Sequence, residues 1–416
     1  MGENKQMRVL FVVKEFLPKP TPPGICIMNV QKALLEKGVQ SDVLMVGEDE
    51  GLYRSSEMGE IYSIKSEISF ETGKEGIFGY LKTRIPMIFT WPVPSMKRVQ
   101  DYRRVITKLN ESKQYDAIIG TMFPPDVCVA CSVFDHFFYY ELDSLINNPM
   151  YKEGFKRHFT GRLSRLEKKL FDHAELIIHL NHNKYFYAKE KYRIYADKFV
   201  YTDIPNLTIK KDAHNGIAEY GKVLSNITED TIVMVYSGLL SKDYRSPYRL
   251  IQMLKAISKN LDLKCLFFSR GNCEDELRKA EEETGGAIQR MGYVSQNELE
   301  HYVDRADFLL DIGNRLSGDD YSVPSKVICY MATGKPIIHM NGTNDSAIDY
   351  LDKYGLSIHV SDELSIDTAQ QLVMQFIKKN KKRRIPFSEV AEKFPQNTPE
   401  HTADIIINQI KKRSNQ

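Results

Sequence analysis

The feature that most constrains the fold is an alternation of short apolar runs with longer amphipathic stretches, and the chain shows it twice. The apolar runs of the first series have the length of buried strands and lie at 8–13, 42–46, 115–120, 137–142 and 175–179. Those of the second series lie at 232–236, 264–268, 287–290, 308–311, 336–339 and 357–360. Helices fit between them, for example at 247–258 and 296–304. This pattern predicts an α/β protein with two doubly wound, Rossmann-like units, each with a mostly parallel sheet and helices on both faces.

The length and one pause in the pattern predict the domain organisation. The chain has 416 residues, which is enough for two domains of ordinary size. The alternation pauses at Asp203-Ile204-Pro205-Asn206 and continues as polar sequence to about Asn215. We therefore expect one domain over 1–205, a second over 206–385, and a helical tail over 386–416 that includes an amphipathic stretch at 402–410.

Composition excludes several classes of function. The net charge is only +2, with 42% hydrophobic and 27% charged residues, so no global charge imbalance points to nucleic acid. Only Cys128 and Cys131 of the six cysteines lie close together, which favours buried, reduced thiols over a zinc site. Lys14 and Glu15 end the first apolar run after a strand's length, and no run approaches the ~20 residues that span a bilayer. We expect a cytoplasmic protein whose contact with a membrane, if any, is peripheral.

A polar loop, a helix start and a tight turn follow one another between Asn314 and Ile338. Pro324-Ser325-Lys326 suits a helix start, because proline is tolerated in the first turn. Gly334 suits the end of that helix, and the apolar residues after it suit a buried strand. The start of a helix presents unpaired N–H groups and a partial positive charge, which suit a phosphate. Taken alone, an ordinary α/β turn explains the segment equally well.

Glycines and cations follow the other strands of the second series. Ligands of open α/β sheets bind beyond the carboxyl ends of the strands, so the loops there are the place to look. These loops contain Gly238, Lys242, Arg245, Arg270, Gly271, Gly292, Tyr293, Val294, Gly313, Asn314 and Arg315. Arg245 or Arg270 alone is more simply a surface charge, but arginine can hold a diphosphate through paired hydrogen bonds. Together with the helix start at Ser325, these loops predict a phosphate site.

Several familiar catalytic motifs do not occur in the sequence. It contains no G-x-x-x-x-G-K-[ST] loop and no G-x-G-x-x-G after the first strand, which argues against a P-loop NTPase and a dinucleotide enzyme. H-E-x-x-H and G-x-S-x-G are also absent, which weakens hydrolase interpretations.

The two series and the phosphate site together resemble a GT-B glycosyltransferase, over nearly the whole chain. The closest similarity is to the retaining, GT4-type enzymes of bacterial surface-polysaccharide synthesis. The matching segments, in chain order, are 16–24 with the helix ending at Gly38, 139–145, 174–179, 204–206, 292–294 and 324–336. The resemblance implies two Rossmann-like domains facing across a cleft, with a C-terminal helix that returns to the N-terminal domain.

The resemblance also implies which residues act. A nucleoside-diphosphate sugar would bind in the C-terminal half, with no permanently bound cofactor and no metal. Tyr293 and Val294 would flank the base, while Arg245 and Arg270 would hold the diphosphate. The remaining donor-binding candidates are Gly24, Gly271, Asn314, Pro324, Ser325, Lys326 and Cys329. Asp143 either orients the hydroxyl of a saccharide or lipid-linked acceptor or caps the segment after it, and the donor phosphate would take the acceptor proton, with retention.

Three positions depart from the family pattern. Cys329 stands where the family has a glutamate that grips the ribose, Tyr321 where a second glutamate contacts the sugar, and Leu239 where an arginine is common. A thiol is a poor acceptor for a hydroxyl group compared with a carboxylate. These departures leave two alternatives open: a non-catalytic GT-B scaffold or partner subunit, and an epimerase or hydrolase of sugar nucleotides.

The sequence gives fewer signals for the part of the protein that would bind the acceptor. Residues 151–170 form a basic amphipathic stretch, which either lies on an anionic membrane surface or packs on its own sheet with a solvated face. His136 and His179 lie beside strands, and we expect structural roles for both.

Overall fold

The computed structural model describes residues 6–18, 20–65, 90–122, 124–146, 158–209, 224, 227–313, 323–340 and 345–415. The chain divides into two compact units, one made of residues 1–206 with 396–416 and the other of 207–395. The stretch expected as a single tail is therefore divided, because 386–395 belongs to the second unit and only 396 onward to the first.

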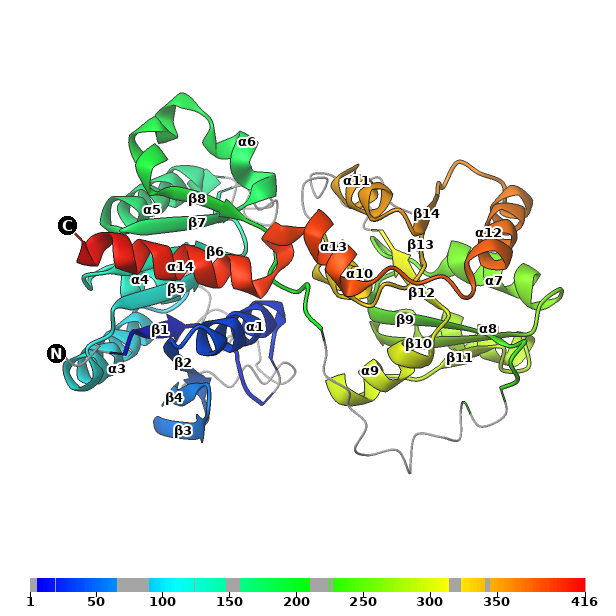
Figure 1. Ribbon diagram of the computed structural model, residues 1–416, viewed down its shortest axis with the longest axis horizontal. Helices are drawn as coiled ribbons and strands as arrows, with labels where there is room; N and C mark the ends of the chain where they lie inside the picture. The colour runs from blue at the N-terminus through cyan, green and yellow to red at the C-terminus, as the bar shows by residue number, and fades with distance from the viewer. Residues whose placement is uncertain are drawn as a thin grey trace. The chain divides into compact units, whose positions relative to one another are not determined.

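The sheet of the first unit has the strand order β3-β4-β2-β1-β5-β6-β7-β8 (Figure 1). Its strands are β1 (Arg8–Val12), β2 (Gln40–Gly47), β3 (Gly51–Ser56), β4 (Gly59–Lys65), β5 (Ala117–Met122), β6 (Phe137–Glu141), β7 (Leu176–Leu180) and β8 (Phe199–Thr202). Neighbouring strands run parallel except β3, which pairs antiparallel with β4. β1 lies between β2 and β5, so the order of strands reverses there.

Helices cover both faces of this sheet, because the central strands are apolar on both sides. The helical segments are α1 (Pro22–Glu36), α3 (Met96–Lys113), α4 (Pro125–Cys131), α5 (Thr160–His173), η3 (Asn181–Asn183), α6 (Lys184–Tyr187), η4 (Glu190–Lys198) and α14 (Pro399–Ser414), and the short η6 (Pro395–Asn397) crosses the boundary between the units. Alternate strand residues enter two different cores, one shared with α3, α4 and α5, the other with α1 and α14. In Figure 1 the C-terminal helix α14 lies beside α1, as the resemblance implied.

The second unit has a six-stranded parallel sheet with the order β11-β10-β9-β12-β13-β14. Its strands are β9 (Ile232–Leu240), β10 (Leu263–Gly271), β11 (Ile288–Arg290), β12 (Phe308–Ile312), β13 (Ile337–Met340) and β14 (Ser357–Val360). Its helices are α7 (Tyr248–Ser258), α8 (Glu274–Glu283), α9 (Gln296–Arg305), α10 (Ser325–Ala332), α11 (Asp345–Tyr354), α12 (Ile366–Asn380) and α13 (Phe387–Lys393). One core contains side chains of α7, α8 and α12, and the opposite core contains those of α9, α10, α11 and α13. The prediction of two doubly wound α/β units is confirmed.

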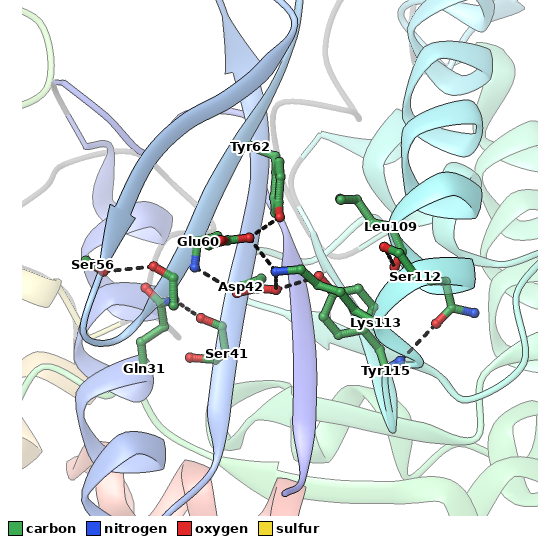
Figure 2. Close-up of polar contacts among 12 residues, drawn as sticks. Gln31, Ser41, Asp42, Ser56, Glu60, Tyr62, Leu109, Ser112, Lys113 and Tyr115 are labelled. Atoms are coloured by element: carbon green, nitrogen blue, oxygen red, sulfur yellow. Dashed lines mark hydrogen bonds and ion pairs between the residues drawn. The ribbon is translucent and has the colours of Figure 1, made fainter.

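A polar network joins the amino ends of β2 and β4 to the end of α3 (Figure 2). Lys113 Nζ lies 2.7 Å from Asp42 Oδ2 and 2.5 Å from Glu60 Oε2. The hydroxyl of Tyr115 donates to Asp42 Oδ2 at 2.6 Å, and the backbone N–H of Glu60 donates to Asp42 Oδ1 at 2.7 Å. Burial alone would lower the pKa of Lys113, but its hydrogen bonds to Asp42 and Glu60 outweigh this and raise it. Lys113 is thus the cation that balances two carboxylates at this edge of the sheet.

Replacing Lys113 by methionine should destabilise the first unit by about 3 kcal/mol, because it leaves the buried Asp42 without its cation. Lys108→Met is a matched control, since Lys108 is exposed on the same helix, and it should change the free energy of unfolding by no more than about 0.5 kcal/mol. Urea unfolding of both variants measures the difference. Equal effects of the two substitutions would contradict a structural role for the network.

Candidate functional site

The site of the second unit lies where its strand order reverses. β9 and β12 are neighbours in the sheet, but the chain continues from β9 toward β10 on one side and from β12 toward β13 on the other. Loops therefore diverge beyond the carboxyl ends of β9 and β12, and open α/β sheets bind their ligands in the crevice expected at such a point.

Helix α10 begins beside this crevice. Pro324 is its N-cap, with an extended backbone and no side-chain hydrogen bond to the first turn. The hydroxyl of Tyr330 on α10 accepts a hydrogen bond from the backbone N–H of Ser237 at 2.9 Å and lies 3.0 Å from its Oγ. This contact fixes α10 against the carboxyl end of β9, as the predicted phosphate site requires.

Lys326 extends from the first turn of α10 into the same region. Its Nζ lies 2.6 Å from Asp311 Oδ1 and 4.3 Å from the centre of the Tyr236 ring. A Cβ placed on Gly238 would lie 3.7 Å from this ammonium, so a glycine leaves room beside it. Burial lowers the pKa of Lys326, Asp311 opposes this by attraction, and Arg245 adds to it by repulsion.

Arg245 is the second cation of the crevice. A bridge between Ser241 and Arg245, with hydrogen bonds of 3.1 and 3.0 Å, forms a tight turn directly after β9. The guanidinium is close enough to lower the pKa of Lys326, and its Nε is buried with no partner among the residues that the structure describes. The structure therefore brings together two residues that the sequence predicted separately.

Asp311 and His339 complete the cluster and were not predicted. Asp311 is 1% exposed and uses its second oxygen, Oδ2, to contact His339 Nδ1 at 2.6 Å. Burial alone would raise the pKa of Asp311, but Lys326 and His339 outweigh it and hold it well below its usual value. Both residues occur in runs that were interpreted only as apolar strands. The available signal was that each is a lone ionisable residue in such a run.

Arg270 and Tyr293 form a stacked pair at the end of β10. The guanidinium lies 3.5 Å from the centre of the Tyr293 ring, and both side chains are exposed. Val294 is half-buried and packs at the edge of the apolar core on the α10 face. Gly271 is needed because its left-handed backbone approaches β9, where an added Cβ would lie 1.8 Å from Leu240 O.

The other predicted residues lie in different places. Cys329 is half-buried on α10, whereas Asn314 and Tyr321 lie outside the described residues. Gly24 belongs to the first turn of α1 rather than to the loop before it, and an added Cβ would lie 2.6 Å from Glu15 O. Asp143 is exposed just after β6. The predicted roles of these residues stay predictions.

The first unit buries an acidic cluster near the ends of β6 and β7. Glu141 contacts His179 Nδ1 and accepts a hydrogen bond from the Tyr187 hydroxyl at 2.7 Å. Glu167 on α5 accepts from Tyr187 at 3.2 Å and from Tyr192 at 2.7 Å. His179 is fully buried and stacks on Tyr187, with 3.9 Å between ring centres. These contacts favour the structural role expected for His179.

The surroundings of Cys128 and Cys131, and of possible metal ligands, can be compared with what the composition predicted. Cys128 and Cys131 are buried, and burial raises the pKa of each thiol above its ordinary value. Within the described ranges, no group of three or more histidine, cysteine or acidic residues is placed to hold a metal ion.

The length and apolar character of the helices bear on whether the chain could cross a membrane. Among those that the structure describes, none combines the length and the apolar character needed to cross a membrane.

Comparison with known proteins bears on the fold. No family model and no curated protein matches the sequence. Among solved structures, WaaG, a glycosyltransferase involved in lipopolysaccharide biosynthesis, is similar at 13% identity, with 96% of this chain and 99% of that one covered and a TM-score of 0.55. A UDP-N-acetylglucosamine 2-epimerase matches at 10% identity, 94% coverage of both chains and a TM-score of 0.53. The N-terminal domain of trehalose-6-phosphate phosphatase from Candida albicans matches at 14%, with 99% and 98% covered and a TM-score of 0.60. The chain thus has the GT-B fold, with two Rossmann-like domains.

Glu167 makes the stability of the first unit depend on pH. Burial raises its pKa to about 8, so the folded chain keeps a proton that the unfolded chain loses above its ordinary value of 4.5. The stabilisation is complete below that value and is lost as the pH rises toward about 8, with a slope of up to about 1.4 kcal/mol per pH unit. Glu167→Gln should flatten this part of the profile in urea unfolding.

The control is Glu190→Gln, because the side chain of Glu190 is 85% exposed. It should leave the pH dependence as it is in the wild type. Identical slopes for the wild type and Glu167→Gln would show that Glu167 is not the titrating group.

Proposed function

We propose that this protein is a glycosyltransferase that moves a sugar from a nucleoside-diphosphate sugar to a saccharide or lipid-linked acceptor. The observation that carries the proposal is the meeting of Lys326, Arg245 and the start of α10 at the reversal of strand order in a GT-B fold. A diphosphate suits this arrangement, because it can accept hydrogen bonds from Arg245 and from the N–H groups of the helix start, while the buried ammonium of Lys326 adds its positive charge.

The same groups suggest how the reaction is promoted. When the bond between sugar and diphosphate breaks, negative charge grows on the departing phosphate oxygen. Fixed cations and N–H dipoles in a partly buried crevice stabilise that charge without having to reorganise. We propose that Lys326 and Arg245 supply this stabilisation and that the transfer needs no metal ion.

The nucleoside would lie on the side of β10. Tyr293 offers an aromatic face for the base, and Arg270 already holds this ring by stacking. Cys329 replaces the carboxylate that grips the ribose in the family that the sequence resembles. We therefore propose that the sugar–nucleotide contacts of this chain depend more on the diphosphate and the base than on the ribose hydroxyls.

The acceptor side of the proposal rests on the resemblance and on the surface of α5. We propose retention, with Asp143 orienting the acceptor hydroxyl and the donor phosphate taking its proton, in the synthesis of a cell-surface polysaccharide or glycoconjugate. Leu163 and Leu170 bind α5 to the core, whereas Arg165, Lys168 and Lys169 are exposed. This basic face would suit peripheral contact with the anionic, cytoplasmic surface of a membrane.

Binding of UDP-, GDP-, ADP- and CDP-sugars, measured by thermal shift and calorimetry, tests the donor site. One base should bind, and Arg245→Gln should weaken that binding roughly ten- to a hundredfold, because it removes a charge-assisted contact to phosphate. Lys242→Gln is the matched control in the same loop: its ammonium lies 2.8 Å from Glu276 on α8, so the affinity should stay unchanged.

The outcomes separate the alternatives. If the folded protein binds none of these donors, it is a non-catalytic scaffold rather than a transferase. If Arg245→Gln binds as tightly as the wild type, the phosphate site is wrongly placed. Sugar release or epimerisation without an acceptor, in place of transfer, would identify a hydrolase or an epimerase.

A further inference from the structure

The segment after β7 carries the two most exposed large apolar side chains in the described part of the chain. Tyr185 on α6 is 88% exposed and Ile194 on η4 is 74% exposed. Single exposed apolar side chains are common on soluble proteins and need no explanation. Two of them in one short segment, at exposures this high, make the segment a candidate for contact with an apolar partner.

The other aromatic side chains of this segment hold it on the first unit. Tyr187, Tyr192 and Tyr195 are buried in the core that includes side chains of α5. Their rings lie against the ring of Phe171 on α5, with 5.9, 6.2 and 5.4 Å between ring centres. Because these three tyrosines face inward, the two exposed apolar side chains are held on the outer side of a well-packed segment.

Exposed cations accompany the two apolar side chains. Nζ of Lys189 lies 4.3 Å from the centre of the Phe186 ring, and Nζ of Lys191 lies 4.4 Å from that of Tyr192. Between 158 and 198, seven lysine and arginine side chains are exposed, namely Arg165, Lys168, Lys169, Lys184, Lys189, Lys191 and Arg193. The exposed acidic side chains of this range are three, namely Asp172, Glu190 and Asp197. Together with the two apolar side chains, the seven cations form what we call the α6 surface.

Contacts between α5 and η4 join the two parts of the α6 surface. Lys168 on α5 pairs with Asp172 at 3.1 Å, and Asp172 accepts a hydrogen bond from the Tyr195 hydroxyl at 2.6 Å. Lys198 Nζ donates to the backbone carbonyls of Phe171 and Asp172 at 3.0 and 3.1 Å. The cations of α5 therefore continue into those of α6 and η4, and Figure 1 shows α5 and α6 next to β7 and β8.

We propose that the α6 surface binds a bilayer that contains anionic lipids, with Tyr185 and Ile194 inserted among the headgroups. The proposal rests on the peripheral membrane contact of the proposed function and does not require the donor site. The cations are attracted to the negative surface, and an amphipathic tyrosine suits the boundary between water and lipid. One weak signal gives only marginal attachment, so charge and apolar insertion act together. A nucleic acid would attract the same cations but offers no apolar layer for Ile194.

Sedimentation with vesicles tests the apolar part of this surface. The probes are vesicles of phosphatidylcholine and vesicles of an equal mixture of phosphatidylcholine and phosphatidylglycerol. The wild type should bind the mixed vesicles, and less tightly as salt is raised, because salt screens exposed charges. Tyr185→Ser combined with Ile194→Ser should weaken this binding roughly tenfold, because two apolar side chains no longer leave water. Tyr248→Ser is the control, since Tyr248 is 63% exposed in the second unit, and it should bind as the wild type does.

A second pair of substitutions tests the charge. Lys189→Gln combined with Lys191→Gln should also weaken binding to the mixed vesicles roughly tenfold, because each cation near an anionic surface adds to the attraction. Lys378→Gln combined with Lys379→Gln removes the same charge from exposed positions at the end of α12 in the second unit. This control should leave the binding unchanged. None of these variants should alter the affinity for a nucleotide sugar.

Fluorescence reports insertion directly. The chain contains one tryptophan, Trp91, so the wild type supplies the background signal. When mixed vesicles are added to Tyr185→Trp, its emission should shift to shorter wavelength, and brominated lipids should quench it. Tyr248→Trp should show neither change.

The outcomes separate this proposal from the donor site. If the wild type binds a donor but no vesicles, this proposal falls and the donor site stands; if it binds mixed vesicles but no donor, the α6 surface stands alone. Vesicle binding that survives both substituted pairs would overturn the proposal. So would an equal loss in the α12 control, because total charge would then suffice. If the serine variants instead separate a dimer in ultracentrifugation and keep vesicle binding, the surface contacts a second copy of the chain rather than a membrane.

Discussion

The ion pair between Lys326 and Asp311 is the interaction on which the second unit depends. A buried ammonium is costly unless a carboxylate balances it, and a buried carboxylate is costly unless it is fully hydrogen-bonded. Here the carboxylate of Asp311 contacts both Lys326 at the start of α10 and His339 on β13, which is the second strand from β9 in the sheet. The same contact therefore joins the start of the helix to the sheet and holds a positive charge beside Gly238 at the carboxyl end of β9.

Part of this arrangement follows from the sequence, and part depends on contacts that no local pattern encodes. The central strands were predictable because their apolar runs are buried on both faces. The strand β3 was missed, since all its residues are exposed and it shows no alternation of buried and exposed positions. That Arg245 and the start of α10 lie at the same edge of the sheet was predictable, because loops at the carboxyl ends of parallel strands must converge. His339 could not be predicted, because its partner is fixed by the register between β12 and β13.

The two units have similar strand orders but differ in the ionisable side chains that they place near the ends of their strands. Near the ends of β6 and β7, the first unit buries Glu141 and Glu167, which are satisfied by tyrosine hydroxyls and one histidine. At its reversal point the second unit carries Lys326 and Arg245 against a single buried carboxylate. The net charge of +2, taken over the whole chain, does not reveal this difference between the two units. The second unit thus concentrates positive charge near its reversal point, although the chain as a whole is almost neutral.

Helix α14 has a consequence for the order in which the protein folds. It supplies Ala403, Ile406, Ile407 and Ile410 to the core that also contains Ile27 and Val30 of α1. The first unit is therefore completed by the last helix described, while the residues of the second unit are contiguous in the chain. During synthesis the second unit can close as soon as it has left the ribosome. The first must keep one apolar face uncovered until α14 emerges, and for that period its α1 face is a surface that chaperones can recognise.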